Sequence, residues 1–305
     1  MTSNQAFLNG RWVDASSVAL PLDDVGFQLG VTVVERLRTF GGAPFQVEGH
    51  LRRLERSLQI VGWDAARIVR QVRGAIGEYC ERNRPLMAPG DDWAIVAIVS
   101  PGRSADAADP WICVYGFPLA FASFAHQYDQ GVHLCVTDVR QTPTNCWPAE
   151  LKCRSRMHYY LADREAARRF PGSRAVLLDQ RGFVGEASTA NIVCWYEQSP
   201  EHGGRLVIPR QEGVLPGISQ AFLFELADQL GVERREADLT PEQLASADEV
   251  LLTSTSVCVL PVVRVDHAKI GAGKPGPMHA KLLAAWSERV GVDIAAQARQ
   301  FAKRD

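Results

Sequence analysis

The stretch that decides the fold runs from residue 149 to residue 191 and reads AELKCRSRMHYYLADREAARRFPGSRAVLLDQRGFVGEASTAN. It contains a single lysine, Lys152. The sequence has 33 Lys and Arg residues, of which five are Lys, and the other four lysines lie in the last forty residues. Arg keeps its proton at usable pH, whereas a desolvated Lys becomes a neutral amine nucleophile. A lone Lys in an Arg-rich chain therefore suggests chemistry, with an ordinary surface Lys as an alternative of equal weight.

The residues after Lys152 predict a helix, a strand and a polar loop in succession. The helix covers 156–170, with an apolar face at helical spacing, and the strand covers 175–179. A DQRG turn follows, and then GEASTAN with the isolated Glu186. The residues of the apolar face are Met157, Tyr160, Leu161 and Ala167. Ordinary packing is the expected role of both Tyr159 and Tyr160.

Length and charge exclude several classes of protein. A chain of 305 residues is long for one compact core and favours two domains. The net charge of −2, with acids and bases interspersed, leaves no basic stripe for nucleic acid. No apolar run approaches the length of a membrane span, and the first residues lack the features of a signal peptide. We therefore expect a cytoplasmic protein with no nucleic-acid or membrane partner.

Cysteine usage argues against a metal site. The seven cysteines are odd in number, scattered along the chain and without a CxxC pair. Neither a zinc site nor a disulfide framework is indicated. We expect most of them to be small buried apolar residues.

Residues 1–117 predict a small α+β domain. FLNGRWVDA is typical of a hairpin with an Asn-Gly turn, and VTVVERLRTFGGAPFQV of a second hairpin closed by Gly-Gly. In GHLRRLERSLQIVGW, leucines and a valine recur at spacings of three and four, and the arginines lie off this apolar stripe. Asp64 is placed to cap a second helix that runs to Arg82. Two apolar strands, 93–100 and 110–117, flank a polar loop.

The remaining sequence predicts a linker over 118–131, a larger α+β domain over 132–290 and a C-terminal tail over 291–305. The linker shows no clear period and has turn residues at both ends. The expected helices are 156–170, 217–230 and 277–290. The expected strands are 131–139, 173–179, 190–196, 205–209, 249–255 and 259–265.

Two stretches of the larger domain resemble anion sites. Pro216-Gly217 breaks the chain, and Ile218 and Ser219 then open a helix whose free N–H groups and positive dipole end suit a phosphate. A strand that ends in TSTS, at 253–256, presents a cluster of hydroxyls. Taken singly, an ordinary helix cap and an ordinary turn explain these two features as well.

Taken together, a lone Lys, an isolated Glu, a helix-start anion site, a hydroxyl-rich strand end and an Arg-bearing helix suit pyridoxal 5′-phosphate. The sequence also resembles the class IV (fold-type IV) pyridoxal-phosphate aminotransferases. That family includes the branched-chain and D-amino-acid aminotransferases and aminodeoxychorismate lyase. The resemblance runs from about residue 7 to residue 276 and is carried by FLNGRWVDA, GHLRRLERS, ELKCRS, REAARR, GFVGEASTANIV, VLPGIS and ADEVLLTSTSVCVLPV.

The resemblance implies a two-domain α+β fold with the cofactor at the domain junction, and a role for each matching residue. Lys152 matches the Schiff-base lysine and Glu186 the partner of the pyridine nitrogen. Arg53 matches a phosphate ligand. The other implied cofactor-binding residues are Ile218, Ser219, Thr255 and Ser256.

The resemblance leaves the substrate open. Glu35 matches an acid of the D-amino-acid and branched-chain enzymes. The D-amino-acid enzymes have a tyrosine where Val34 falls, and the branched-chain enzymes have one where Met157 falls. Aminodeoxychorismate lyase has a hydroxyl residue where Arg36 falls. Arg36, Arg38 and Arg103 are candidates for holding a substrate carboxylate, and each is equally explained as a solvated or ion-paired Arg.

The implied activity is transfer of an amino group between an amino acid, with branched-chain amino acids among the candidates, and a 2-oxo acid such as 2-oxoglutarate. A lyase of the aminodeoxychorismate lyase type and a non-catalytic pyridoxal-phosphate-binding protein remain alternatives. The family also implies a homodimer in which a first-domain loop, here 101–110, reaches the partner's site.

Overall fold

The computed structural model describes residues 3–197 and 204–303, and its chain divides into two compact units. Unit 1 comprises Met1–Leu119 together with Glu150–Ser155, and unit 2 comprises Ala120–Ala149 together with Arg156–Asp305. The short segment that carries Lys152 therefore belongs to unit 1 and not to the larger unit in which its sequence position placed it. The reason is strand pairing: Cys153 forms an antiparallel bridge with Val33 of unit 1.

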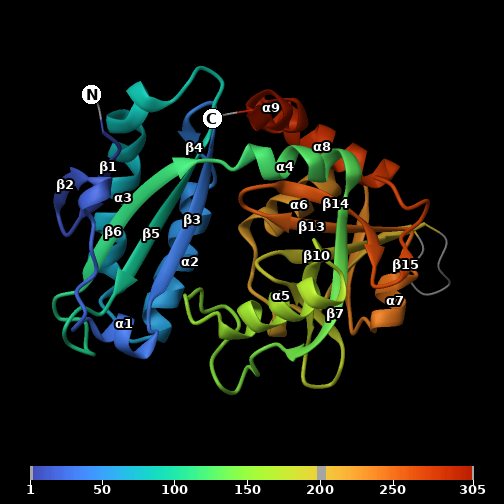
Figure 1. The fold of residues 1–305 in the computed structure, drawn as a ribbon, viewed down its shortest axis with the longest axis horizontal. Coiled ribbons are helices and arrows are strands. Elements are labelled where there is room, and N and C mark those ends of the chain that lie inside the picture. Colours follow the sequence, from blue (N-terminus) through green and yellow to red (C-terminus); the bar gives the residue numbers. More distant parts are fainter. Residues whose placement is uncertain (1–2, 198–203, 304–305) are drawn as a thin grey trace. The chain divides into compact units, whose positions relative to one another are not determined.

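Unit 1 is built on a six-stranded antiparallel sheet with the order β2-β1-β6-β5-β3-β4 (Figure 1). Its strands are β1 (Gln5–Leu8), β2 (Arg11–Asp14), β3 (Val33–Phe40), β4 (Ala43–Pro44), β5 (Trp93–Ser100) and β6 (Trp111–Pro118). Both predicted hairpins are confirmed. In the first, Asn9 and Gly10 have φ of 46° and 84°, the left-handed pair that a tight two-residue hairpin requires.

Two helices cover one face of this sheet, α2 (Val47–Ile60) and α3 (Ala65–Asn83) (Figure 1). The predicted stripe of α2 is confirmed, because Leu51, Leu54 and Leu58 are buried in the unit 1 core. Asp64 caps α3 as predicted, since its Oδ1 accepts from the Arg67 N–H at 3.0 Å. A short helix, α1 (Val25–Leu29), was not predicted.

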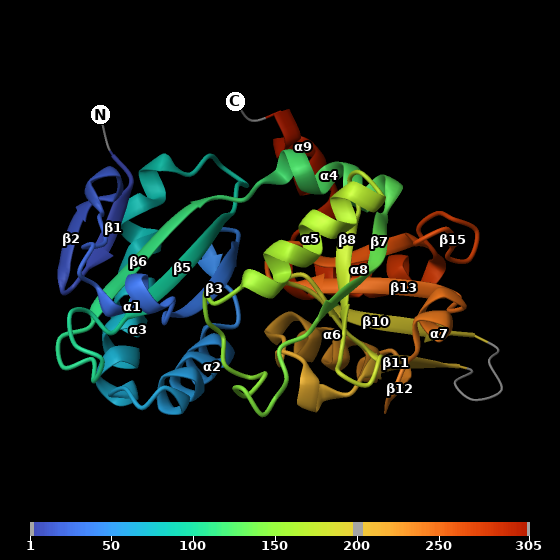
Figure 2. The same cartoon turned by 60° about the horizontal axis from the view of Figure 1, so that its bottom comes forward.

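Unit 2 contains a mixed sheet whose path is β12-β11-β10-β13-β14-β7-β8-β9, with β15 paired to β14 (Figure 2). Its strands are β7 (Val132–Arg140), β8 (Arg174–Leu178), β9 (Val184–Ala187), β10 (Asn191–Tyr196), β11 (Arg205–Pro209), β12 (Glu233–Ala237), β13 (Glu249–Ser254), β14 (Cys258–Val265) and β15 (Ala268–Lys269). All six predicted strands are present. The charged strand β12 at the sheet edge and the short strand β9 were not predicted.

The helices of unit 2 include two in segments expected to be irregular. The linker predicted over 118–131 contains α4 (Phe121–Gln130), because Phe121, Ala125 and Tyr128 are buried and anchor it to unit 2. The tail predicted over 291–305 contains α9 (Ile294–Gln300), which Asp293 caps and whose Ile294 and Ala298 are buried. The other helices are α5 (Met157–Arg169), α6 (Ile218–Gln229), α7 (Pro241–Ala245) and α8 (Pro277–Val290).

The predicted packing face of α5 is wrong. Met157, Tyr160 and Leu161 are 68%, 61% and 49% exposed. The helix instead packs on β7 and β8 through a face of small residues, Ala162 and Ala166, both fully buried (Figure 2). Small side chains allow a close approach to the sheet, and the hydrophobic pattern alone does not reveal this.

Within residues 3–197 and 204–303, no helix has the length and hydrophobicity needed to cross a membrane. All seven cysteines are free, and five of them are buried. Burial raises the pKa of the Cys80 and Cys135 thiols to about 11, so both stay protonated at neutral pH.

Candidate functional site

The segment that carries Lys152 is fixed to unit 1 through its backbone. The Lys152 carbonyl accepts from the Val34 N–H at 3.0 Å, and the Arg154 N–H donates to the Thr32 carbonyl at 3.1 Å. On the other side, the Lys152 N–H donates to Ser57 Oγ of α2 at 3.1 Å. Leu151 packs against the unit 1 core. The lysine side chain therefore starts from a backbone held by both a strand and a helix.

A buried ionic cluster of Glu35, His50 and Arg53 occupies the same unit. Arg53 donates to both carboxylate oxygens of Glu35, with Nε 3.0 Å from Oε2 and Nη2 2.6 Å from Oε1. His50 Nδ1 lies 3.0 Å from Glu35 Oε1. Because Glu35 lies on β3 and the other two residues lie on α2, the cluster ties the helix to the sheet.

Electrostatics fix the charges of this cluster. Burial opposes a charge on Glu35, but the Arg53 charge and the contact with His50 hold the pKa of this carboxyl well below its usual value. Burial lowers the pKa of His50, and the Arg53 and Lys152 charges lower it further, against the opposing Glu35 charge. Glu35 is thus ionised and His50 neutral at neutral pH.

The sequence placed Arg53 off the apolar stripe of its helix and Glu35 among the substrate candidates. The structure buries both side chains and joins them in one ion pair. The pairing cannot be read locally, since 18 positions separate the two residues. Arg53 as a phosphate ligand stays a prediction, and any such role is exercised by a guanidinium that Glu35 orients.

The other substrate candidates of unit 1 differ in their surroundings. Arg38 is buried, its Nη2 lies 3.8 Å from Asp92, and its guanidinium stacks on the Phe40 ring at 4.0 Å. Arg103 is exposed and pairs with Asp23 at 2.7 Å. Both arginines are therefore ion-paired, which is the alternative to a substrate-binding role that the sequence left open. Arg36 is half-buried with its guanidinium 5.2 Å from the centre of the Phe117 ring, and Val34 is buried.

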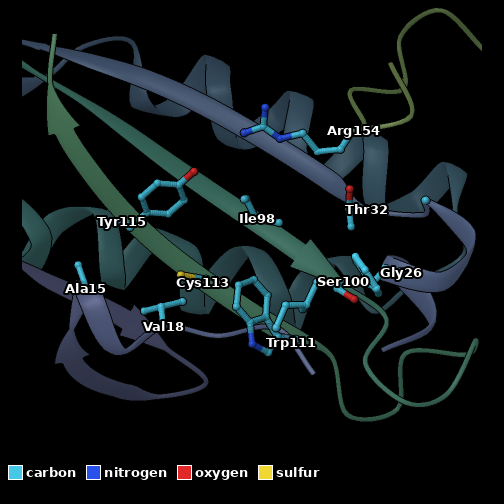
Figure 3. Close-up of a pocket in the computed structure, with 13 residues that line it drawn as sticks. Ala15, Val18, Gly26, Thr32, Ile98, Ser100, Trp111, Cys113, Tyr115 and Arg154 are labelled. Atoms are coloured by element: carbon cyan, nitrogen blue, oxygen red, sulfur yellow. The ribbon is translucent and has the colours of Figure 1, made fainter. Parts of the chain in front are cut away.

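Unit 1 also contains a cavity of about 570 Å³ that the sequence did not indicate (Figure 3). Its lining comes from the 15–32 region, from β5 and β6, and from the lysine segment, so no local motif marks it. Figure 3 shows Arg154 above a largely apolar floor that includes Ile98 and Tyr115. Arg154 lies two residues after Lys152, on a segment paired with Thr32.

In unit 2, Glu186 lies in the middle of a buried hydrogen-bonded group. Its side chain is on β9 and it is 4% exposed. Gln141 Nε2 donates to Glu186 Oε1 at 2.5 Å, and the Tyr159 hydroxyl donates to the same oxygen. Burial and the adjacent Glu186 charge hold the pKa of Tyr159 well above its usual value. Tyr159 therefore remains a donor across the working pH range.

Sequence reasoning missed both of these partners. Tyr159 was assigned to ordinary packing, and Gln141 was not singled out. The useful signal was the spacing of Tyr159, Ala162 and Ala166, which marks the small-residue face of α5 and places the phenol on the side that meets the sheet. No local signal pointed to Gln141.

The start of α6 is shaped by two of the motifs. Gly217 is its N-cap residue and supplies no side-chain cap, so none of the first N–H groups is capped by that residue. Asn191, from GEASTAN, donates through Nδ2 to the Leu215 carbonyl at 2.9 Å. A Cβ on Gly217 would overlap Asn191 Oδ1. The two motifs therefore fit together only because residue 217 is glycine.

The strand register brings the hydroxyl cluster at 253–256 to the same end of the sheet as Asn191. Asn191 at the start of β10 pairs with Thr253 near the end of β13. Thr255 and Ser256 lie in the turn directly after β13, and both are half-buried. Ser219 in the first turn of α6 is buried. The Asn191 contact at the α6 loop and the hydroxyl turn thus belong to one end of unit 2, and a shared phosphate site of Ile218, Ser219, Thr255 and Ser256 stays a prediction.

Comparisons with known proteins agree with this architecture. The family model of amino-transferase class IV matches residues 32–265. The branched-chain-amino-acid aminotransferase of Salmonella typhimurium is 27% identical over 295 residues, with 91% of each chain covered. The D-alanine aminotransferase of Bacillus licheniformis is 25% identical over 283 residues, covering 90% of this chain and 93% of the relative.

Among solved structures, the T.th. branched-chain amino acid aminotransferase with pyridoxamine 5′-phosphate superposes with a TM-score of 0.83. It is 22% identical, and 95% of each chain is covered. This likeness shows the fold. Because the family match spans well over half of the sequence and includes Lys152 and Glu186, the chain belongs to the class IV aminotransferases.

Proposed function

We propose that this protein is a pyridoxal-phosphate-dependent aminotransferase that moves an amino group between an amino acid and a 2-oxo acid. The observation that carries the proposal is the buried Glu186 carboxylate with its two hydrogen-bond donors. A buried carboxylate that accepts hydrogen bonds from neutral donors can also accept one from a cationic N–H group placed beside it, and such a charge-assisted bond is strong. The protonated ring nitrogen of pyridoxal phosphate supplies such a group.

The side chains present fit this cofactor in chemistry. Lys152 is an amine on a rigid backbone, suited to a covalent link. The N-terminus of α6, with no side-chain cap from Gly217, offers N–H donors to a phosphate through Ile218 and Ser219. Thr255, Ser256 and Arg53 add hydroxyl and guanidinium donors. We assign these residues to one cofactor on the strength of the family, whose motifs they match.

When bound, pyridoxal phosphate supplies an electron sink that makes the α-proton of an amino acid acidic. Lys152 would carry the cofactor, and its free amine would serve as the base that removes the proton from Cα of the amino acid and as the acid that gives a proton back. Glu186 would keep the ring nitrogen protonated. Arg53 would be held in place by Glu35 while it neutralises phosphate charge.

The proposed substrate is an amino acid of either enantiomer. Relatives named for branched-chain amino acids and for D-alanine are both similar to this chain, so both enantiomers are candidates. The residues Val34, Met157 and Arg36 distinguish this chain from the subgroups described above. Arg36, Arg38 and Arg103 are all proposed as candidates for holding a substrate carboxylate, and Arg38 and Arg103 also pair with Asp92 and Asp23.

The test is a half-reaction with purified, pyridoxal-phosphate-loaded protein. Each L- and D-amino acid is added singly, without an oxo acid, and the yellow absorbance is followed. Bleaching by an amino acid, with release of its 2-oxo acid, is the expected result, and 2-oxoglutarate should restore the colour. Pyruvate release from aminodeoxychorismate, with the colour unchanged, would identify a lyase instead. A protein that binds the cofactor but reacts with none of these compounds would contradict both activities.

We further propose a homodimer whose active site is completed by the 101–110 loop of the partner subunit. The loop is polar and carries exposed charged residues, and its Arg103 pairs with Asp23 within the same subunit. Two inactive variants, Lys152→Ala and a deletion within 101–110, should recover part of the activity when their subunits are mixed. No recovery in subunits that demonstrably exchange, or an active monomer in sedimentation, would show that one chain builds the whole site.

A further inference from the structure

Two side chains from separate elements donate to the Glu186 carboxylate, and both donate to the same oxygen. Tyr159 comes from α5, and Gln141 directly follows the last residue of β7. Neither residue belongs to any of the seven sequence motifs that carry the resemblance to the family. We propose that Tyr159 and Gln141 are positioning residues that hold Glu186 ionised and fixed in direction. This inference rests on the proposed function, in which Glu186 pairs with the ring nitrogen of the cofactor.

The helix α5 is fixed so that the phenol reaches Glu186. Ala162 and Ala166 are fully buried against the sheet, which brings the helix close to β7 and β8. On the same face, Asp163 accepts from Ser188 Oγ at 2.6 Å, and Ser188 directly follows β9. A larger side chain at the alanine positions would lift the helix and withdraw the hydroxyl. Tyr159 is therefore delivered by the packing of the whole helix.

Gln141 is equally constrained. Its N–H donates to the Leu178 carbonyl at 2.9 Å, and its carbonyl accepts from Gln180 Nε2 at 2.7 Å. Its side chain is buried, and a contact with the Tyr159 hydroxyl joins the two donors. The backbone N–H and carbonyl of Gln141 are thus held by β8 and by the turn after it. The amide thus points at Glu186 without having to be ordered by a ligand.

The physical consequence concerns where a proton resides. A buried carboxyl group without donors takes up a proton, because burial disfavours its charged form. Hydrogen bonds to the charged form reverse this preference. Tyr159 keeps its own proton, since its pKa is raised. The two donors therefore make Glu186 a weaker base. The proton between the Glu186 carboxylate and the ring nitrogen of the cofactor then stays on the nitrogen.

The experiment measures that proton directly, by nitrogen-15 NMR of pyridoxal phosphate labelled at the ring nitrogen and bound to the protein. The wild type should show a protonated ring nitrogen. Tyr159→Phe should shift the proton towards Glu186 by about ten- to hundredfold in the equilibrium, the range for losing a hydrogen bond to a charged group. Tyr160→Phe is the matched control: it is the next residue on the same helix, is 61% exposed, and should leave the signal unchanged.

A second variant and a second measurement separate positioning from folding. Gln141→Leu removes the other donor from a different element and should shift the signal in the same direction, so it replaces Tyr159→Phe if that variant does not fold. In both variants the turnover number should fall while the KM for the amino acid changes little. A merely structural role would lower stability and leave the nitrogen signal in place.

The outcomes are distinct. A ring nitrogen that stays protonated in both folded variants would overturn this inference and leave the proposed function intact. A wild-type protein that binds no pyridoxal phosphate would overturn the proposed function and this inference with it. A wild type with an unprotonated ring nitrogen would overturn the pairing on which the inference depends.

Discussion

Gly217→Ala should destabilise unit 2 although residue 217 has an ordinary backbone conformation. Its φ of −72° and ψ of 127° suit any residue, so the effect must come from contacts. The added Cβ would overlap Asn191 Oδ1 and lie 3.1 Å from Asn191 Cγ. The buried Asn191 side chain must then rotate, which breaks its 2.9 Å bond to the Leu215 carbonyl.

The magnitude follows from these two effects. Leaving the carbonyl without its donor costs about 1–3 kcal/mol, and overpacking of a tight site costs about 1–3 kcal/mol. Because some relaxation is shared between them, we expect a loss of about 2–4 kcal/mol in the free energy of unfolding. The loop before α6 would also move, so pyridoxal phosphate should bind more weakly.

The assay is urea denaturation of the protein without cofactor, with a matched glycine as control. Gly213→Ala lies four residues earlier, has no atom within 4 Å of the added Cβ, and should change stability by less than about 1 kcal/mol. Asn191→Ala should remove the obstacle, so in that background Gly217→Ala should cost little. Equal stability of Gly217→Ala and Gly213→Ala would refute the steric reasoning, and so would additive losses in the double variant.

Three further predictions concern the lysine, the carboxylate and a buried histidine. Lys152→Ala should fold but show no yellow absorbance of lysine-bound pyridoxal phosphate, and persistence of that absorbance would reassign the lysine. Glu186→Gln should retain the covalent link yet slow removal of the α-proton by orders of magnitude, measured as exchange of the α-hydrogen with deuterium; an unchanged rate would mean that another acid serves the ring. Burial lowers the pKa of His279 to about 4. The neutral, buried imidazole therefore makes its full contribution to the free energy of unfolding above a pH of about 6.5, the pKa in the unfolded chain. This contribution is lost as the pH falls from about 6.5 to about 4. The loss amounts to about 3 kcal/mol; His279→Gln should reduce the difference in urea midpoint between pH 7 and pH 4.5, and an undiminished difference would assign the acid sensitivity to other groups.

The elements that the sequence predicted well are those in which local pattern and tertiary packing agree. In α2, Leu51, Leu54 and Leu58 recur with the helical period and are all buried. The Asn9-Gly10 turn has no competing arrangement, because few residue pairs adopt two left-handed conformations in succession. Motif order and spacing likewise indicated the class IV aminotransferase family, which the family match over residues 32–265 shows, and the roles of Lys152 and Glu186 stay predictions.

The failures have a common physical cause: contacts between residues far apart in the sequence decided the outcome. In α5 the hydrophobic pattern favoured Met157, Tyr160 and Leu161, but the sheet takes the alanine face, and three large apolar side chains remain exposed within unit 2. The aromatic residues of α4 carry no clear period, and the helix forms because Phe121 and Tyr128 find buried positions. Arg53 is polar in any hydrophobicity scale, and it is buried because Glu35 lies opposite on β3.

The same reasoning explains the incomplete prediction of the site. Residue type and spacing marked the groups that would touch a cofactor. The residues that contact Glu35 and Glu186 from other elements, namely His50, Tyr159 and Gln141, have no distinctive neighbours in the sequence. Orientation is a property of the folded chain, so the structure was needed to find them.

The excursion of residues 150–155 into unit 1 has a consequence for synthesis of the protein. The chain leaves unit 1 after Leu119 and returns to it only at Glu150, so unit 1 lacks the partner of Val33 and Val34 while the intervening 30 residues, Ala120–Ala149, emerge from the ribosome. At about 5–20 residues per second this interval lasts on the order of seconds. During that time the edge of β3 at Val33 and Val34 lacks its partner, whereas the other end of the strand is already paired with β4 at Thr39 and Phe40. A nascent chain arrested before residue 150 would therefore expose a strand edge to other chains, and a separately produced 150–155 peptide would have a ready position on a fragment that ends at Leu119.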